Sequence, residues 1–149
     1  MVEDYQAAVD LIDTNSSLLE TERESLIRSR IGQGKFRTAL LEKYHGACII
    51  TGITLKSLLI ASHIKPWAVC NNEERLSTEN GLLLCANYDR LFDCGLISFN
   101  NNGHIMISRY ISKSNREKLH LKSEIVAHFV SSAAIWNNLE YHRDVIFLS

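Results

Sequence analysis

The first third of the chain carries apolar residues at helical spacing. Apolar positions three or four apart occur in residues 3–30 and again in residues 35–45. This spacing predicts one or two amphipathic helices in the first segment and one in the second. Gly32-Gln33-Gly34 lies between them and predicts a break in the helical structure. The second helix would turn a single apolar face to the core, formed by Phe36, Leu40 and Tyr44.

The centre of the chain alternates short apolar runs with turn residues, which predicts a small α+β domain. Strands are expected at residues 47–51, 57–64 and 80–85, with a polar loop at 70–79 and a helix at 88–93 capped by Asn87. A β-hairpin is expected from residues 96–99 and 104–108, and further helices near 114–119 and 123–138. The two short strands and one helix between residues 58 and 94 are too few to form a core, so flanking helices must cover their apolar faces.

The composition is that of a globular protein and argues against disordered, secreted and membrane-spanning classes. With 149 residues, of which 46% are apolar and 22% charged, the chain fits one ordinary globular domain rather than a disordered segment. No apolar run approaches the ~20 residues needed to span a bilayer, and the first residues lack the apolar stretch of a secretory signal. We therefore expect a cytoplasmic protein with no membrane partner.

The four cysteines, at positions 48, 70, 85 and 94, include no Cys-x-x-Cys pair. This disfavours a zinc ribbon, and free buried thiols are the favoured interpretation in a reducing compartment. A small structural zinc domain that uses Cys48, Cys85 and Cys94 stays open as an alternative.

The charge is distributed unevenly along the chain. Residues 1–25 hold seven acidic residues against Arg23 alone, so the rest of the chain is mildly basic although the net charge is −1. We interpret residues 1–30 as an acidic helical arm or a linker remnant, and residues 31–149 as the functional domain. The basic excess alone is too small to argue for nucleic acid.

Four polar residues follow the predicted strands and helix in an order that suits phosphodiester hydrolysis. His63 ends an apolar strand, and an imidazole that titrates near ~6.5 is a suitable base to activate water. Asp89 and Asp93 are four apart, which puts both carboxylates on one face of a helix where Mg²⁺ or Mn²⁺ would bind. Asn80, at the start of the second strand, would fix the loop that carries His63.

An ordered set of short motifs resembles the restriction-type branch of the HNH endonuclease family. The set runs through Ala61-Ser62-His63-Ile64-Lys65-Pro66-Trp67, Asn80-Gly81-Leu82-Leu83-Leu84 and Asp89-Arg90-Leu91-Phe92-Asp93-Cys94-Gly95. Similar pieces precede it (Gly32 to Arg37, Cys48 to Gly52) and follow it (Tyr141-His142-Arg143), so the resemblance covers about residues 31–147. The resemblance implies a ββα-metal (HNH) finger supported by flanking helices and a β-hairpin.

The resemblance also implies a role for each site residue. His63 would be the general base, Asn80 the asparagine that orients the catalytic loop, and Asp89 and Asp93 the ligands of one catalytic divalent ion. The implied activity is metal-dependent hydrolysis of double-stranded DNA, in restriction or defence against foreign DNA. The chain departs from the family pattern at Ser62, where many members carry an acid or histidine, and it lacks the final histidine. Carboxylate ligands favour Mg²⁺ or Mn²⁺ over Zn²⁺.

Contacts with DNA and with other chains are expected on weaker grounds. Candidate phosphate-binding residues are Lys35, Arg37, Lys65 and Arg90, and a basic run lies at 109–122. The remaining histidines, including His142, are assigned to the surface or to packing. A homodimer would supply two sites for a double-strand cut, and a sensor or recognition domain would sit in a longer parent chain. The alternative function is an HNH-fold DNA-binding or interaction module that has lost cleavage.

Overall fold

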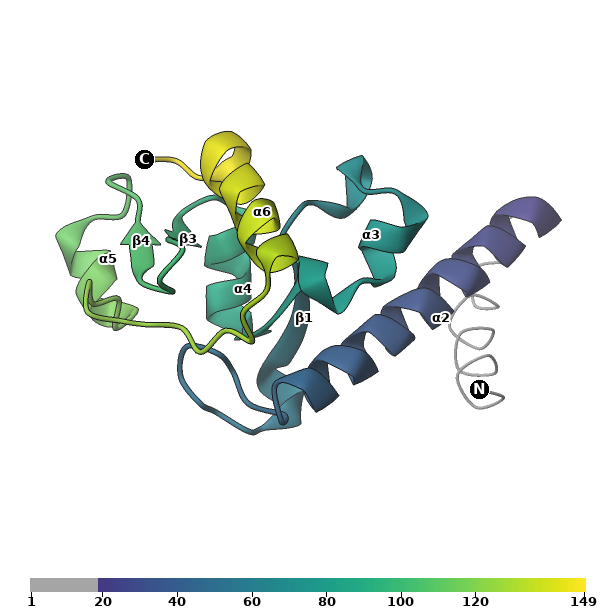
Figure 1. Cartoon of the computed structure of the whole chain (residues 1–149), viewed down its shortest axis with the longest axis horizontal. Helices are drawn as coiled ribbons and strands as arrows, with labels where there is room; N and C mark the ends of the chain where they lie inside the picture. Colours follow the sequence, from purple (N-terminus) through teal and green to yellow (C-terminus); the bar gives the residue numbers. More distant parts are fainter. Residues whose placement is uncertain (1–18) are drawn as a thin grey trace.

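The computed structural model describes residues 19–149, and it begins with one long helix. Helix α2 (Glu20–Lys43) runs for 24 residues along one side of the domain (Figure 1). The predicted break at Gly32-Gln33-Gly34 is therefore wrong. Glycine inside a helix lowers helix stability by about 1 kcal/mol relative to alanine. It has no side chain that could compete for the helical backbone hydrogen bonds. Burial of Phe36 and Leu40 against the domain holds the helix together across this stretch. The part of the predicted arm in residues 1–18 lies outside the described residues.

A β-hairpin followed directly by a helix forms the centre of the domain. Strand β1 (Leu59–His63) pairs antiparallel with β2 (Gly81–Cys85), and His63 lies opposite Gly81. Helix α4 (Ala86–Asp93) begins immediately after β2, which confirms the expected strand–strand–helix order and the α+β class. Every residue of β2 is buried, because α2 covers one face of the hairpin and α4 the other.

The connection between β1 and β2 is more ordered than the predicted polar loop. It contains a 3₁₀ turn at Trp67–Val69, the short helix α3 (Asn72–Leu76) and a second 3₁₀ turn at Thr78–Asn80. The side chain of Asn71 accepts a hydrogen bond from Glu74 N–H, and the Glu74 carboxylate accepts one from Asn71 N–H. This capping box explains why so short a helix forms.

A second hairpin and three short helices complete the domain. Strands β3 (Ile97–Phe99) and β4 (Ile105–Ile107) pair as predicted, and α5 (Lys113–Lys118) is close to its predicted position. The predicted helix at 123–138 is wrong in its first half. Residues 125–127 instead run beside the hairpin, where Ile105 N–H donates to Ile125 O and Ala127 N–H to Gly103 O. Helix α6 occupies only Ala133–Tyr141, and a π-helical turn (His142–Ile146) follows it.

The predicted strand at 47–51 is a turn. Gly52 N–H donates to Cys48 O at 2.9 Å, and the positive φ of Gly52 (74°) closes the turn. The segment is apolar because Cys48 and Ile49 are buried against β2, where Ile49 N–H donates to Leu83 O. Burial, rather than a strand conformation, accounts for the apolar pattern.

One core joins all of these elements. Its fully buried members come from the hairpin, α4, β3 and α6, and include Leu82, Leu84, Phe92, Phe99 and Leu139. The described cysteines are free thiols, three buried and Cys94 exposed. Across residues 19–149, no helix combines the length and apolar character needed to cross a membrane.

Candidate active site

The end of β1 and one face of α4 line a common cavity of about 330 Å³. His63 closes β1, and Asp89 and Asp93 lie one turn apart on α4, so the local structure brings all three to this cavity. The fourth predicted residue, Asn80, is buried behind it. The sequence therefore identified residues that the fold places together.

His63 is held in one tautomer by a backbone carbonyl. Its Nε2 lies 2.8 Å from the carbonyl oxygen of Arg75. Because a carbonyl oxygen only accepts, Nε2 must carry the proton and donate it to this bond, which leaves Nδ1 as a free acceptor. Burial lowers the pKa of His63, the bond to the Arg75 carbonyl raises it, and the nearby Arg75 charge lowers it further, with a net downward shift. The ring is therefore neutral at pH 7.

Aromatic side chains fix the plane of the His63 ring. Phe36 of α2 stacks against it with ring centroids 4.1 Å apart and an interplanar angle of 9°. Trp67 meets it edge-on at 5.7 Å and 78°. These contacts bury part of the imidazole, and burial is the main cause of its lowered pKa. Phe36 was expected to face the core, and no local signal in the sequence links Phe36 or Trp67 to the histidine.

Asn80 ties the β1–β2 connection to the start of β2. Its side chain is almost fully buried, and Oδ1 accepts a hydrogen bond from Lys65 N–H at 2.8 Å. Nδ2 lies 3.3 Å from the carbonyl oxygens of both Lys65 and Glu74 and from Cys70 Sγ. The two ends of the segment after His63 are thus joined through one amide. This agrees with a residue that orients the loop, although the functional role itself stays a prediction.

Asp89 and Asp93 form a pair of carboxylates whose charges are poorly compensated. Burial and then repulsion from Asp89 together raise the pKa of Asp93 to about 6, against the lowering effect of Arg90. Burial likewise raises the pKa of Asp89, against the lowering effects of the Ser62 hydroxyl and Arg90. Asp93 lies exposed on the rim, so solvent screens part of the repulsion.

This arrangement fits a divalent cation. Two neighbouring carboxylates with raised pKa values gain from a bound positive charge, and oxygen ligands suit Mg²⁺ or Mn²⁺. Ser62 Oγ lies buried beside them without a partner at full hydrogen-bonding geometry among the described residues. Within residues 19–149 no cluster of three or more His, Cys, Asp or Glu side chains forms a ligand set. A cation at Asp89 and Asp93 would therefore take its other ligands from water and phosphate, as Mg²⁺ commonly does.

The structure gives the four candidate phosphate-binding cations different surroundings. Lys65 Nζ donates to Glu74 Oε2 at 2.8 Å and lies over the Tyr141 ring. Arg37 donates to the carbonyl oxygens of Leu59 and Lys56, so it caps the start of β1. Both side chains therefore already have partners within the protein. Lys35 and Arg90 are exposed.

His142 lines the same cavity but is a structural residue. Its Nε2 donates to Phe92 O at 2.8 Å, and its Nδ1 accepts from Ser98 Oγ at 2.8 Å. The ring stacks on Phe92 with centroids 3.7 Å apart, and burial lowers its pKa to about 4 against the effect of the Phe92 carbonyl. Both ring nitrogens are thus engaged, which confirms the assignment of His142 to packing.

The cysteine-based alternative finds no support in the geometry. Cys48 and Cys85 are neighbours in the core, where Cys85 N–H donates to Cys48 Sγ. Cys94 is exposed at the end of α4, and no three-ligand group forms among the described residues.

Comparison with known families agrees with the geometry of the cavity. Residues 48–100 match the sequence model described as HNH endonuclease. The matched segment contains β1, β2 and α4 together with His63, Asn80, Asp89 and Asp93. Comparison with curated proteins gave no significant match. The match over residues 48–100 supports membership of the HNH endonuclease family.

Proposed function

We propose that the protein is a metal-dependent DNA endonuclease in which His63 activates the attacking water. The observation that carries the proposal is the bond from His63 Nε2 to the Arg75 carbonyl, in a ring that lines one cavity with Asp89 and Asp93. It leaves the second ring nitrogen unprotonated, in a side chain that shares its cavity with two candidate metal ligands. A base, a cation site and a fixed orientation are the three requirements of this hydrolysis.

The chain's own residues supply the proton transfer and the positioning. His63 Nδ1 accepts a proton from water as the water attacks phosphorus, and the lowered pKa keeps this nitrogen available at pH 7. Phe36 and Trp67 hold the ring plane, and Asn80 holds the segment that follows His63. A divalent cation bound at Asp89 and Asp93 would neutralise charge on the phosphate and on the leaving 3′ oxygen.

The biological setting is proposed from the family resemblance. HNH membership supports a nucleic-acid substrate, and we infer double-stranded DNA, Mg²⁺ or Mn²⁺ rather than Zn²⁺, and a role in restriction or defence in the cytoplasm. A homodimer would place two sites on one duplex, and a recognition domain in a longer parent chain would supply sequence specificity.

A non-cleaving DNA-binding module is the second candidate. Ser62 stands where many family members carry a metal ligand, and only two carboxylates of the described residues reach the cavity. A weak cation site would leave the fold and the DNA contacts intact but abolish hydrolysis.

Plasmid cleavage tests the first candidate against the second. Supercoiled plasmid is incubated with the protein in Mg²⁺, in Mn²⁺, in Zn²⁺ or in EDTA. We expect nicking in Mg²⁺ or Mn²⁺ that falls at least ~100-fold in His63→Ala. Asp89→Asn should lose the metal-dependent activity, whereas the exposed His128→Ala serves as a matched control and should cleave as the wild type does. An intact plasmid under every metal, with DNA binding retained, would overturn the endonuclease proposal in favour of the binding module.

A further inference from the structure

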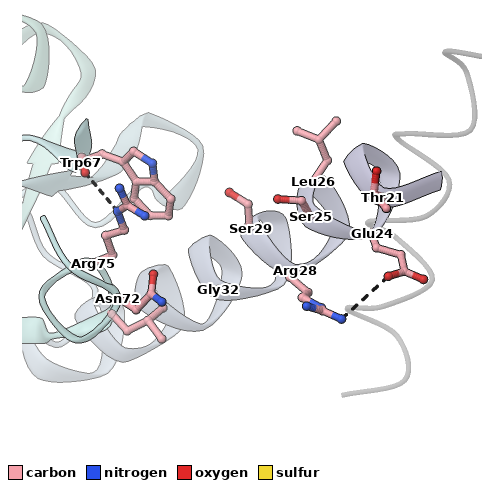
Figure 2. Close-up of a pocket in the computed structure, with 11 residues that line it drawn as sticks. Thr21, Glu24, Ser25, Leu26, Arg28, Ser29, Gly32, Trp67, Asn72 and Arg75 are labelled. Carbon is pink, nitrogen blue, oxygen red and sulfur yellow. Dashed lines mark hydrogen bonds and ion pairs between the residues drawn. The ribbon is translucent and has the colours of Figure 1, made fainter. Parts of the chain in front are cut away.

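Three open cavities meet at Trp67 and extend from the candidate active site along helix α2. Trp67 lines the cavity of Asp89 and Asp93, a neighbouring one at Phe36 and Arg37, and a larger one of about 870 Å³. The largest cavity, here called the α2 groove, lies between the first half of α2 and the segment of Trp67 and Arg75 (Figure 2). Trp67 therefore borders both the α2 groove and the cavity of the candidate active site.

The charge of α2 changes sign within the groove, because the lining includes Glu24 and the charged residues that follow it up to Leu41 are all basic. Residues 25–41 contain four basic residues and no acidic residue, whereas the chain before them is strongly acidic. Arg28 lines the groove with its side chain 82% exposed, and its guanidinium turns toward Glu24 at 3.9 Å (Figure 2). Such a long, exposed ion pair contributes little and leaves Arg28 available to another anion.

Arg75 presents a second guanidinium at the inner end of the groove. Its guanidinium carbon lies 4.5 Å above the Trp67 ring, and its Nε donates to Trp67 O at 3.1 Å. This contact holds the planar group in place, and within residues 19–149 the hydrogen bonds of Arg75 leave its two terminal nitrogens free. A fixed guanidinium with two free nitrogens matches the bidentate geometry of a phosphate.

The rest of the lining is mixed, with Glu24, Leu26 and Leu76 beside small polar side chains. α2 contributes Thr21, Ser25, Ser29 and Gly32, and α3 contributes Asn72. Small hydroxyl and amide side chains bind phosphate and sugar oxygens, and they let a strand approach the helix closely. Because Arg75 already covers one face of Trp67, that face is closed to a stacking base. The small polar side chains of the groove therefore offer contacts to the sugar–phosphate backbone.

We propose that the α2 groove binds the sugar–phosphate backbone of the DNA strand on one side of the cleaved bond, with Arg75 and Arg28 as its phosphate-binding residues. The inference rests on the proposed function and extends it. Arg75 links the two sites directly, because its backbone carbonyl orients His63 while its guanidinium faces the groove. A phosphate on Arg75 fixes the register of the strand relative to the base. Recognition of this kind is largely independent of sequence.

DNA binding without cleavage tests the groove by itself. A fluorescein-labelled 20-base-pair duplex and its single strand are titrated in EDTA, and anisotropy gives the Kd over a series of salt concentrations. We expect Arg28→Gln and Arg75→Gln each to weaken duplex binding roughly three- to tenfold, and to lower the slope of log Kd against log salt by about 0.9. Arg30→Gln is the matched control, because it removes the same charge from an exposed position of α2 that lines none of the three cavities.

A second readout locates the bound strand. Trp67 and Trp136 are the two tryptophans of the chain, so Trp136→Phe leaves Trp67 as the sole fluorophore of its type. Its emission is expected to change on addition of duplex, with the same Kd as the anisotropy signal. The groove proposal would be refuted if wild type, Arg28→Gln, Arg75→Gln and Arg30→Gln bound duplex with equal Kd values. It would also be refuted if duplex left the emission of Trp67 unchanged. Tighter binding of the single strand would assign the groove to unpaired DNA and overturn the duplex assignment.

The plasmid assay keeps the two proposals separate. Groove-dependent binding by a protein that cleaves under no metal would retain the groove and reject the endonuclease. Normal cleavage by Arg28→Gln and Arg75→Gln at low enzyme concentration would retain the endonuclease and reject the groove.

Discussion

Acidification is expected to destabilise the fold through His142, whose neutral ring is built into the core. The ring is almost fully buried, stacks on Phe92 and hydrogen-bonds on both sides. Protonation would place a charge in this position. The Ser98 hydroxyl can turn to accept from Nδ1–H, so the cost comes mainly from burial of the charge, and this burial lowers the pKa of His142 to about 4.

The size of the effect follows from the two pKa values. In the unfolded chain the pKa is 6.5, so between pH 6.5 and pH 4 the unfolded state binds more protons than the folded state. The free energy of unfolding must then fall as the pH falls. The contribution of neutral His142 is fully present above pH 6.5 and is lost toward pH 4. A shift of this size corresponds to about 3 kcal/mol, a large part of the total stability of a small domain.

Urea unfolding of wild type and His142→Gln over about pH 4 to 8 isolates this contribution. Glutamine keeps polar atoms but does not titrate, so the variant starts less stable and depends less on pH. We expect the stability difference between the two proteins to shrink by about 3 kcal/mol between pH 7 and pH 4. The exposed His128→Gln should follow the wild-type curve. An identical pH dependence in wild type and His142→Gln would refute the reasoning.

Three further predictions concern the base, the helix that supports it and the metal ligands. Phe36→Leu removes the ring stacked on His63, so the lowered pKa of His63 should move back toward 6.5; the acid limb of the pH–rate profile and the histidine NMR titration should shift together, and an unmoved NMR titration would contradict the stacking argument. Gly81→Ala should destabilise the protein by about 1–3 kcal/mol in urea unfolding, because the added Cβ would lie 2.6 Å from the Phe36 ring and 2.7 Å from Leu40; an unchanged midpoint would show that α2 does not press on β2. Asp93→Asn should weaken Mn²⁺ binding at least ~10-fold by calorimetry without lowering the stability of the metal-free protein at pH 7, since it removes a repelling charge; unchanged Mn²⁺ affinity would exclude Asp93 as a ligand.

The parts of the site that are close in sequence were predictable. Asp89 and Asp93 share a helix face because they are four apart, and a helix of that length needs only local information. His63 ends β1 as the apolar run predicted, and Asn80 directly precedes β2. The antiparallel pairing that puts His63 opposite Gly81 follows once these two strands are recognised as a hairpin.

The errors occurred where tertiary contacts decided the conformation. The glycines of α2 predicted a break, but packing of Phe36 and Leu40 on Gly81 favours a continuous helix. Apolar residues near Cys48 predicted a strand, yet their burial is compatible with a turn closed by Gly52. Composition alone does not separate a buried turn from a buried strand, because both require apolar side chains.

The state of the base is the feature that the sequence conceals most completely. Its tautomer depends on the carbonyl of Arg75, its ring plane on Phe36 of α2, and its exposure on Trp67. These contacts come from three segments, and a carbonyl contact leaves no mark on residue identity because every residue has one. The metal ligands depend instead on the identity and spacing of two side chains. A sequence of this family therefore reveals where a cation would bind more readily than which nitrogen of the histidine would accept the proton.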